Sequence, residues 1–298
     1  MPPRPIPAPR IDGYTATTPI PLYWARWGPP GADPIVVLHG GPGASHEYLL
    51  PQLLELAASH DSLHYDQRGG GRSKTDDRTP ITWKVQVADL TDMLAEQRVT
   101  APTIVGYSWG ALLAMLYAIE AAAGRAGPVP ARLVLLDPAP VTRAWRDEFE
   151  REFAARQNGP VVASLRAELA ASGLRESNLD AFRQRSFELS VAGYFANPHR
   201  ATDLTPFRVT GRVQQSIWES LGDFDLLPAL RALKAMAIPT LMVHGRQDPI
   251  PLASSEAAAE AMGARLVVLE DCGHVPYVEQ QEQLMATLRT FLGADAAA

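Results

Sequence analysis

The stretch "TIVGYSWGALLAMLY" (103–117) changes from a strand pattern to a helix pattern at a serine that stands between two glycines. Its first five residues are typical of a buried strand, and the Ala- and Leu-rich run after Gly110 is typical of a helix. The pattern G-x-S-x-G predicts a very tight turn, in which Gly106 and Gly110 must be small to let strand and helix approach. Ser108 is therefore expected in strained backbone geometry, with the first helix amides aimed at whatever it attacks.

Further short apolar runs, bounded by Gly, Pro or Asp, predict that this strand belongs to a parallel sheet buried on both faces. The runs cover residues 34–40, 103–107, 132–138, 240–245 and 265–271. Helical spacing at 83–99 and 282–292 indicates βαβ units, and 12–28 has the pattern of an antiparallel hairpin leading into the sheet. We therefore predict an α/β fold, with a mostly parallel central sheet flanked by helices.

The strand signal disappears between about residues 140 and 225, where amphipathic stretches at 143–157 and 180–195 take over. This change predicts a helical cap (140–225) inserted into a discontinuous core (1–139 and 226–298). Most aromatic residues of this segment are expected to hold its helices together, and a minority to face a pocket. They are Trp145, Phe149, Phe153, Phe182, Phe187, Tyr194, Phe195, Phe207, Trp218 and Phe224.

Composition narrows the class of partner and the cellular location. With 298 residues, 46 % of them hydrophobic, the chain is long enough for one large core with a smaller appended domain. The net charge of −6 argues against nucleic acid or an anionic membrane as partner and favours a small-molecule or short-peptide substrate. A single cysteine, Cys272, and no apolar run typical of a signal peptide or membrane span predict a soluble, cytoplasmic protein. The oligomeric state is left open.

A serine hydroxyl is a poor nucleophile unless a base removes its proton, and the base needs an acid to orient it. After a G-x-S-x-G turn, the expected chain order is Ser, then Asp or Glu, then His, each just past a strand. Asp248 and His274 meet this order, with Asp137 as the alternative acid. The alternative bases are His39, His46, His60, His64, His199 and His244. Two of these, His39 and His244, directly follow apolar runs, where a structural role is expected.

An oxyanion beside Ser108 would need two backbone amides, one of which belongs to the next residue, Trp109. The glycine-rich "HGGPG" (39–43) follows an apolar run, so Gly41 is the expected second donor. The loop "DQRGGGRSK" (66–74) lacks phosphate-loop spacing and is interpreted as a conformationally demanding loop near the site. No zinc motif of the H-E-x-x-H kind and no dinucleotide fingerprint is found, so neither a metal nor a cofactor is predicted. Cys272 is expected to be a packed, uncatalytic side chain.

Together these segments resemble the α/β-hydrolase superfamily and, more narrowly, the proline iminopeptidase family of serine aminopeptidases. The resemblance covers nearly the whole core and rests on "HGGPGASHEYL", "DQRGGGRS", "GYSWG", "GRQDPIP" and "GHVPYVE". It implies an α/β-hydrolase fold. It also implies Ser108 as nucleophile, Asp248 as orienting acid and His274 as base, with the amides of Gly41 and Trp109 as the oxyanion hole.

The same resemblance implies that acidic residues in the cap hold the free α-amino group of the substrate. Trp218 and Glu219 in "IWES" are similar to a Trp-Glu pair in the caps of family members, a solvated helix charge being the alternative for Glu219. Pro249 follows Asp248 where a second acid could stand, and Asp223 and Asp225 are possible substitutes.

The function expected from these resemblances is an aminopeptidase that releases N-terminal proline or another small apolar residue through an acyl-enzyme. A carboxylesterase or amidase acting on small acyl compounds is the alternative, and a ligand sensor without enzymatic activity is a third possibility.

Overall fold

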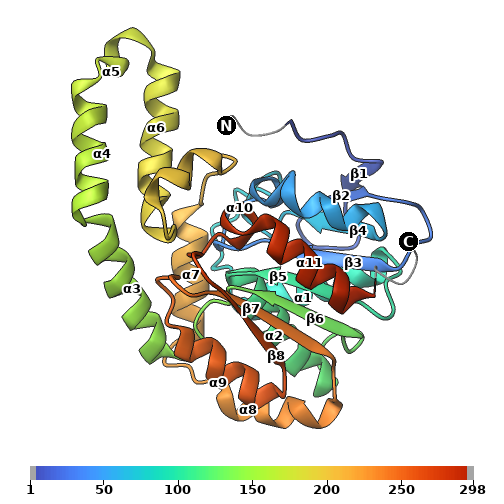
Figure 1. Ribbon diagram of the computed structural model, residues 1–298. Coiled ribbons are helices and arrows are strands. Elements are labelled where there is room, and N and C mark those ends of the chain that lie inside the picture. Colours follow the sequence, from blue (N-terminus) through green and yellow to red (C-terminus); the bar gives the residue numbers. More distant parts are fainter. Residues whose placement is uncertain (1–4, 294–298) are drawn as a thin grey trace.

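An eight-stranded sheet forms the centre of the computed structural model, which describes residues 5–293 (Figure 1). The strand order is β1-β2-β4-β3-β5-β6-β7-β8, in which the β1–β2 and β2–β4 pairs are antiparallel and all other pairs are parallel. The strands are β1 (Ile11–Tyr14), β2 (Tyr23–Trp27), β3 (Pro34–Leu38), β4 (Asp61–Tyr65), β5 (Thr103–Tyr107), β6 (Arg132–Leu136), β7 (Thr240–Gly245) and β8 (Arg265–Leu269).

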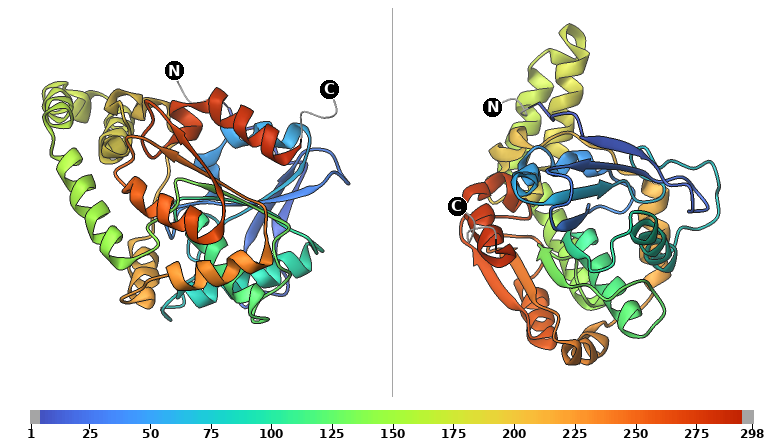
Figure 2. Two further views of the ribbon diagram at one scale, coloured as in Figure 1. Left: turned by 60° about the horizontal axis from the view of Figure 1, so that its bottom comes forward. Right: turned by 90° about the vertical axis from the view of Figure 1, so that its right-hand side faces the viewer.

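Helices cover both faces of this sheet (Figure 2). They are α1 (Trp83–Glu96), α2 (Trp109–Ala122), α8 (Leu227–Leu233), α9 (Leu252–Met262), α10 (Pro276–Glu279) and α11 (Gln281–Leu292). Alternate residues of β3 pack into two different hydrophobic cores, one on each face of the sheet. Val36 and Leu38 pack with α1, α2, α8 and α9, whereas Ile35 and Val37 pack with α10, α11 and two short 3₁₀ helices, η1 (His46–Leu49) and η2 (Gln52–Ala58). Burial on both faces explains why the parallel strands read as continuous apolar runs.

The predicted α/β fold is confirmed, and the five apolar runs and the hairpin form seven of the eight strands. The search missed β4, because its sequence "DSLHY" is not an apolar run although all five residues are buried. Asp61, Ser62 and Nε2 of His64 have partners inside the protein, whereas Nδ1 of His64 and the Tyr65 hydroxyl have none among residues 5–293. The carboxylate of Asp61 accepts hydrogen bonds from Arg10 and Arg26, and the Ser62 hydroxyl lies 2.9 Å from Nε2 of His64. Polar residues within this buried strand therefore hide it from a search for apolar runs.

The 140–225 segment leaves the sheet after β6 and returns before β7. It contains α3 (Arg143–Gln157), α4 (Pro160–Ala171), α5 (Leu174–Ser177), α6 (Leu179–Val191) and α7 (Gly211–Leu221), with the short η3 (Ala192–Tyr194) and η4 (Pro198–Asp203) between α6 and α7. In Figure 1, α4 and α6 run side by side away from the sheet. The predicted helix at 143–157 matches α3, whereas the one at 180–195 ends earlier, at Val191.

The two ends of this segment are joined by backbone hydrogen bonds. The amide of Arg143 donates to the carbonyl of Phe224 at 2.8 Å, and the amide of Leu226 donates to the carbonyl of Val141 at 3.0 Å. The chain thus enters and leaves through one narrow stem, so the strands on either side can pair as neighbours. The division into two domains stays a prediction.

None of the helices within residues 5–293 combines the length and the apolar character that a membrane crossing requires. The cytoplasmic location stays a prediction.

Candidate active site

Ser108 occupies a sharp bend between β5 and α2, with φ = 54° and ψ = −118°. A side chain at such positive φ is strained by about 1–3 kcal/mol, which the surrounding packing must offset. The flanking glycines are required by space. A Cβ added at Gly106 would lie 2.6 Å from Cα of Ala111, and one added at Gly110 would lie 2.7 Å from the carbonyl oxygen of His39. The sequence argument for small residues on both sides of the serine therefore has a direct steric cause.

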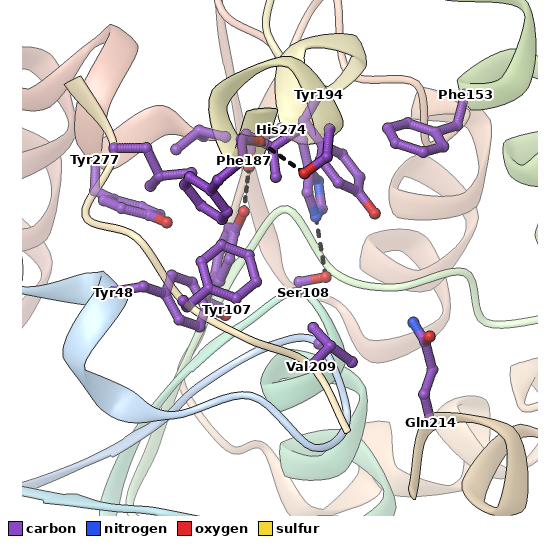
Figure 3. Close-up of a pocket in the computed structure, with 16 residues that line it drawn as sticks. Tyr48, Tyr107, Ser108, Phe153, Phe187, Tyr194, Val209, Gln214, His274 and Tyr277 are labelled. Atoms are coloured by element: carbon purple, nitrogen blue, oxygen red, sulfur yellow. Dashed lines mark hydrogen bonds between the residues drawn. The ribbon is translucent and has the colours of Figure 1, made fainter. Parts of the chain in front are cut away.

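Three side chains from separate loops meet in one hydrogen-bonded row, of which Figure 3 shows Ser108 and His274. Ser108 Oγ lies 3.0 Å from Nε2 of His274, and Nδ1 of His274 lies 2.7 Å from Oδ2 of Asp248. The other oxygen of Asp248 accepts the amide hydrogen of Ile250 at 2.7 Å. These loops follow β5, β8 and β7, whose carboxyl ends share one edge of a parallel sheet. The structure thus brings together all three residues that the chain order selected.

His274 is held from both sides of its ring. Its carbonyl accepts the Tyr107 hydroxyl at 2.8 Å, its amide donates to the carbonyl of Tyr194 at 2.7 Å, and both aromatic rings lie about 5 Å from the imidazole centroid. Burial lowers the pKa of His274 to about 4. The imidazole is therefore neutral at neutral pH. With its Nδ1–H donated to Asp248, its Nε2 is free to accept the Ser108 proton.

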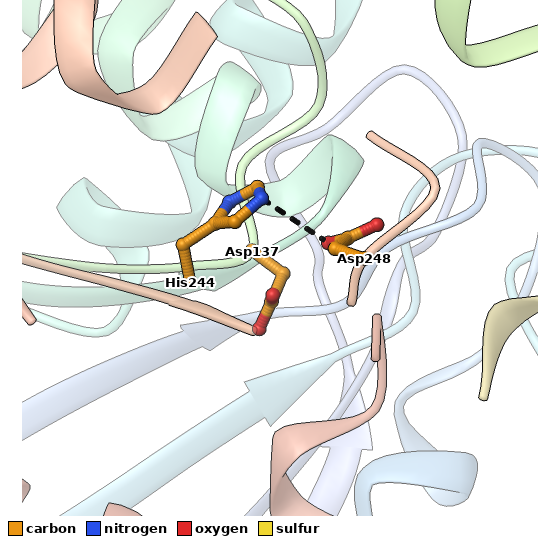
Figure 4. A group of neighbouring side chains, drawn as sticks. All are labelled: Asp137, His244 and Asp248. Atoms are coloured by element: carbon orange, nitrogen blue, oxygen red, sulfur yellow. Dashed lines mark ion pairs between the residues drawn. The ribbon is translucent and has the colours of Figure 1, made fainter. Parts of the chain in front are cut away.

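Asp137, the alternative acid, directly follows β6 and lies beside Asp248 and His244 (Figure 4). Its Oδ1 accepts the amide hydrogen of Gly245 at 2.8 Å, and its Oδ2 has no hydrogen-bond partner among residues 5–293. Burial, together with the neighbouring Asp248, raises the pKa of Asp137 well above its ordinary value. Burial raises the pKa of Asp248 as well, so the two acids differ in position: Asp248 is the one that hydrogen-bonds His274.

Within the described part of the chain, one group of side chains has the spacing of potential metal ligands, namely Asp137, His244 and Asp248. Most of its donor atoms are already engaged. Asp248 uses both oxygens as described above, and His244 Nε2 lies 3.1 Å from the carbonyl of Ile250. These contacts leave Oδ2 of Asp137 without a partner, which does not amount to a ligand set.

The alternative bases lie elsewhere, and none of them hydrogen-bonds Ser108 among the contacts of the described residues. They are His39, His46, His60, His64, His199 and His244. Both ring nitrogens of His39 and of His244 are used in buried hydrogen bonds.

The two amides expected to stabilise an oxyanion lie on either side of Ser108. Trp109 is the first residue of α2, so its amide has no acceptor within the helix. Gly41 lines the same cavity as Ser108, in a loop that turns with φ = 49° at this residue. This loop approaches the serine closely, since a Cβ added at Gly40 would lie 2.8 Å from Cβ of Ser108.

Gln67, which sequence reasoning did not select, joins these two elements. The residue is fully buried, and its Nε2 donates to the carbonyl of His39 at 2.7 Å. Its Oε1 accepts the indole N–H of Trp109 at 2.9 Å, and its amide donates to Nε2 of His39 at 3.0 Å. The sequence contained one signal for it, a polar side chain in the loop "DQRGGGRSK" that was expected near the site.

A cavity of about 340 Å³ opens beside Ser108 and His274 (Figure 3). Its walls are mostly aromatic and aliphatic and come from both the sheet side and the 140–225 segment. Besides those two residues they are Gly41, Tyr48, Tyr107, Phe153, Phe187, Ser190, Val191, Tyr194, Leu204, Phe207, Val209, Gln214, Val275 and Tyr277. The predicted minority of pocket-facing aromatics in this segment is thus Phe153, Phe187, Tyr194 and Phe207, and Tyr48, Tyr107 and Tyr277 were not foreseen.

The expected substrate-binding residue Glu219 does not line this cavity. It is exposed on α7, where its carboxylate accepts a hydrogen bond from Gln215 at 2.7 Å. It borders a separate surface pocket together with Arg78 and Arg212. The structure therefore places it as a solvated helix charge, because the helix turns this residue outward.

Trp218 also lies outside the residues that line the cavity. Its ring packs edge-to-face on Trp109 at 5.6 Å, and the guanidinium of Arg146 lies 3.7 Å from its centroid on another side. Asp223 and Asp225, the possible second acids, are exposed. The structure thus brings the predicted reactive side chains together but not the predicted amine-binding ones.

Known proteins resemble this chain in sequence. The sequence matches the alpha/beta hydrolase family over residues 35–287. It is 27 % identical to a proline iminopeptidase of Lactobacillus crispatus over 286 residues, covering 87 % of this chain and 89 % of the relative. It is 25 % identical to a proline iminopeptidase of Heyndrickxia coagulans over 280 residues, covering 89 % and 92 % of the two chains.

Solved structures show the same fold. A proline iminopeptidase of Mycobacterium smegmatis superposes with a TM-score of 0.67 at 18 % identity, covering 95 % of this chain and 98 % of the other. A proline iminopeptidase-related protein of Thermus thermophilus superposes with a TM-score of 0.69 at 21 % identity, covering 95 % and 97 %. The predicted resemblance is confirmed: the chain belongs to the alpha/beta hydrolase family, and its sequence is similar to proline iminopeptidases.

Proposed function

We propose that this protein is a serine hydrolase that cleaves an ester or amide bond through an acyl-enzyme on Ser108. The observation that carries the proposal is the hydrogen-bonded row of Ser108, His274 and Asp248 at the mouth of a cavity. In the first step Nε2 of His274 takes the hydroxyl proton while Oγ attacks the substrate carbonyl. The same proton then passes to the leaving group, and water repeats the sequence to release the acid and regenerate Ser108.

Asp248 would hold the imidazole in the tautomer that accepts this proton and would stabilise the imidazolium that forms. The amides of Trp109 and Gly41 would donate to the oxyanion of the tetrahedral intermediate. Preorganised donors of this kind act most strongly where water is excluded, and His274 is almost fully buried. We further propose that the 140–225 segment is a cap domain that supplies one wall of the substrate site.

Two substrate classes have support. The curated relatives named proline iminopeptidases favour an aminopeptidase that releases N-terminal proline or another small apolar residue. The apolar cavity beside Ser108 favours an esterase or amidase that acts on uncharged acyl compounds. Both classes use the same acyl-enzyme chemistry, so tests of the mechanism do not depend on this choice.

The serine is tested by replacing Ser108 with alanine. A fluorophosphonate probe should label the wild-type protein at one site, and Ser108→Ala should lose both the label and roughly 10⁶-fold in kcat on p-nitrophenyl butanoate. Circular dichroism checks that the variant is folded. Labelling of folded Ser108→Ala at the wild-type rate would exclude this serine as the nucleophile.

The acid is tested by a matched pair of substitutions. Asp248→Asn should lower kcat by roughly 10⁴-fold, because an amide beside Nδ1 favours the wrong imidazole tautomer. Asp137→Asn keeps a neutral side chain of the same shape and should change kcat only a few-fold while lowering the melting temperature. The assignment of the acid is wrong if Asp137→Asn is the inactive variant and Asp248→Asn keeps its activity.

The base is tested by the pH dependence of kcat/KM. Protonated imidazole cannot accept the serine proton, so activity should be lost as the pH falls through the pKa of His274. Since that pKa is lowered to about 4 from an ordinary 6.5, kcat/KM should stay level between neutral pH and about pH 5 and fall below it. Samples returned to pH 7 before assay control for acid unfolding. A midpoint at 6.5 or above in reversible data would contradict the buried, neutral base.

A further inference from the structure

The cavity beside Ser108 has mostly aromatic and aliphatic walls. The ring of Phe207 lies 4.4 Å from that of Tyr48 and 5.4 Å from that of Phe187, so the core and the 140–225 segment share one aromatic wall. Tyr107 and Tyr277 extend this wall, since their rings meet edge-to-face at 5.2 Å and the ring of Tyr48 lies 6.0 Å from that of Tyr107. Apolar rings at these positions gain most from burying an apolar group of the substrate.

Within residues 5–293, none of the side chains that line the cavity is an Asp, Glu, Lys or Arg. The buried carboxylate nearest in sequence to the base, Glu279, is already occupied by the amides of Gly273 and Asn197. Glu219 faces solvent on α7. An ammonium group that entered this cavity would lose its water and find no carboxylate, which is strongly unfavourable.

From these two observations we infer that the cavity is an acyl-binding site for an uncharged, apolar acyl group, and that it does not select a free α-amine. The inference rests on the proposed acyl-enzyme chemistry and names its substrate class. Size agrees with an aryl or branched alkyl acyl group, because a dry cavity of about 150 Å³ holds benzene and this one measures about 340 Å³. The relatives' activity on N-terminal proline would then not extend to this chain.

Two phosphonates with the same phenoxide leaving groups test this inference, diphenyl cyclopentylphosphonate and diphenyl pyrrolidine-2-phosphonate. They have the same ring size and differ by the ring nitrogen, which is protonated at neutral pH in the second compound. The rate of inactivation by each compound is divided by that compound's rate of hydrolysis in water, which corrects for its intrinsic reactivity. This corrected rate should be about tenfold or more higher for the cyclopentyl compound. An equal or faster rate for the pyrrolidine compound overturns the inference.

Two substitutions sharpen the comparison. Gln214 lines the cavity and is exposed, so Gln214→Glu should supply the missing carboxylate and shift the rate ratio by about tenfold toward the amine. Glu219→Gln should leave both rates unchanged, and a loss confined to the pyrrolidine compound would overturn the inference. If neither phosphonate nor the fluorophosphonate modifies Ser108, as read by intact mass, the proposed function itself fails.

A second inference comes from the hydrogen bonds of Gln67. Its side chain holds the carbonyl of His39, two residues before Gly41, and the indole of Trp109. We propose that Gln67 is a positioning residue that fixes the spacing of the two oxyanion donors. The distance between the two backbone amides matters because both must meet one oxygen atom at about 2.7–3.1 Å.

This second inference, which also rests on the proposed function, is tested by Gln67→Leu with Gln86→Leu as control. Gln86 is buried as well and donates to the carbonyl of Arg68, so it secures the same loop without touching either donor element. Gln67→Leu should lower kcat on p-nitrophenyl butanoate by about 10²-fold with KM nearly unchanged. Gln86→Leu should lower the melting temperature with kcat within a few-fold of wild type.

Trp109→Phe, which removes one of the Gln67 bonds and keeps the backbone amide, should give a smaller loss in kcat and serves if Gln67→Leu does not fold. The inference is overturned if Gln67→Leu or Trp109→Phe lowers stability without lowering kcat, or if both glutamine variants lower kcat equally. If the fluorophosphonate still labels Ser108 in these variants, the proposed nucleophile stands, and either of these results overturns only the role of Gln67.

Discussion

The backbone bend at Ser108 is the constraint on which the rest of the site depends. A non-glycine residue at φ = 54° is unfavourable, and it persists because β5 and α2 are both fixed by burial. The bend requires glycine at positions 106 and 110, since any larger residue would meet backbone atoms. It also turns the hydroxyl out of the sheet toward His274 and leaves the Trp109 amide without a helical acceptor. One strained residue thus determines where the candidate nucleophile and one candidate amide donor lie relative to His274.

The parallel sheet supplies the remaining parts. Because the strands before Gly41, Ser108, Asp248 and His274 run in the same direction, their loops meet at one edge although they are far apart in the sequence. The two ends of the 140–225 segment are joined by backbone hydrogen bonds, and the segment adds aromatic side chains opposite this edge. The proposed bond cleavage therefore depends on residues of the core, whereas the proposed substrate cavity is lined by both the core and the 140–225 segment.

The difference between these parts explains how much could be predicted from the sequence. Ser108, Asp248 and His274 were found because each follows a recognisable strand, and strand order determines which loops meet. Strand β4 was missed because its sequence mixes polar and apolar residues, although all five are buried. Glu219 was expected to bind the substrate, but a Trp-Glu pair on a helix does not reveal which way that helix faces, and α7 turns the carboxylate into solvent. Gln67 contacts residues distant in the chain, and no local pattern encodes these contacts.

The central claim is that Ser108 carries the acyl group of the substrate between two chemical steps. Rapid acid quench during turnover of p-nitrophenyl 3-phenylpropionate, followed by peptide mass mapping, measures this directly. The account predicts one phenylpropionyl group on the peptide that contains Ser108, formed in a burst with the first equivalent of p-nitrophenol and lost as turnover ends. Steady turnover of this ester with the acyl group on another residue would contradict it.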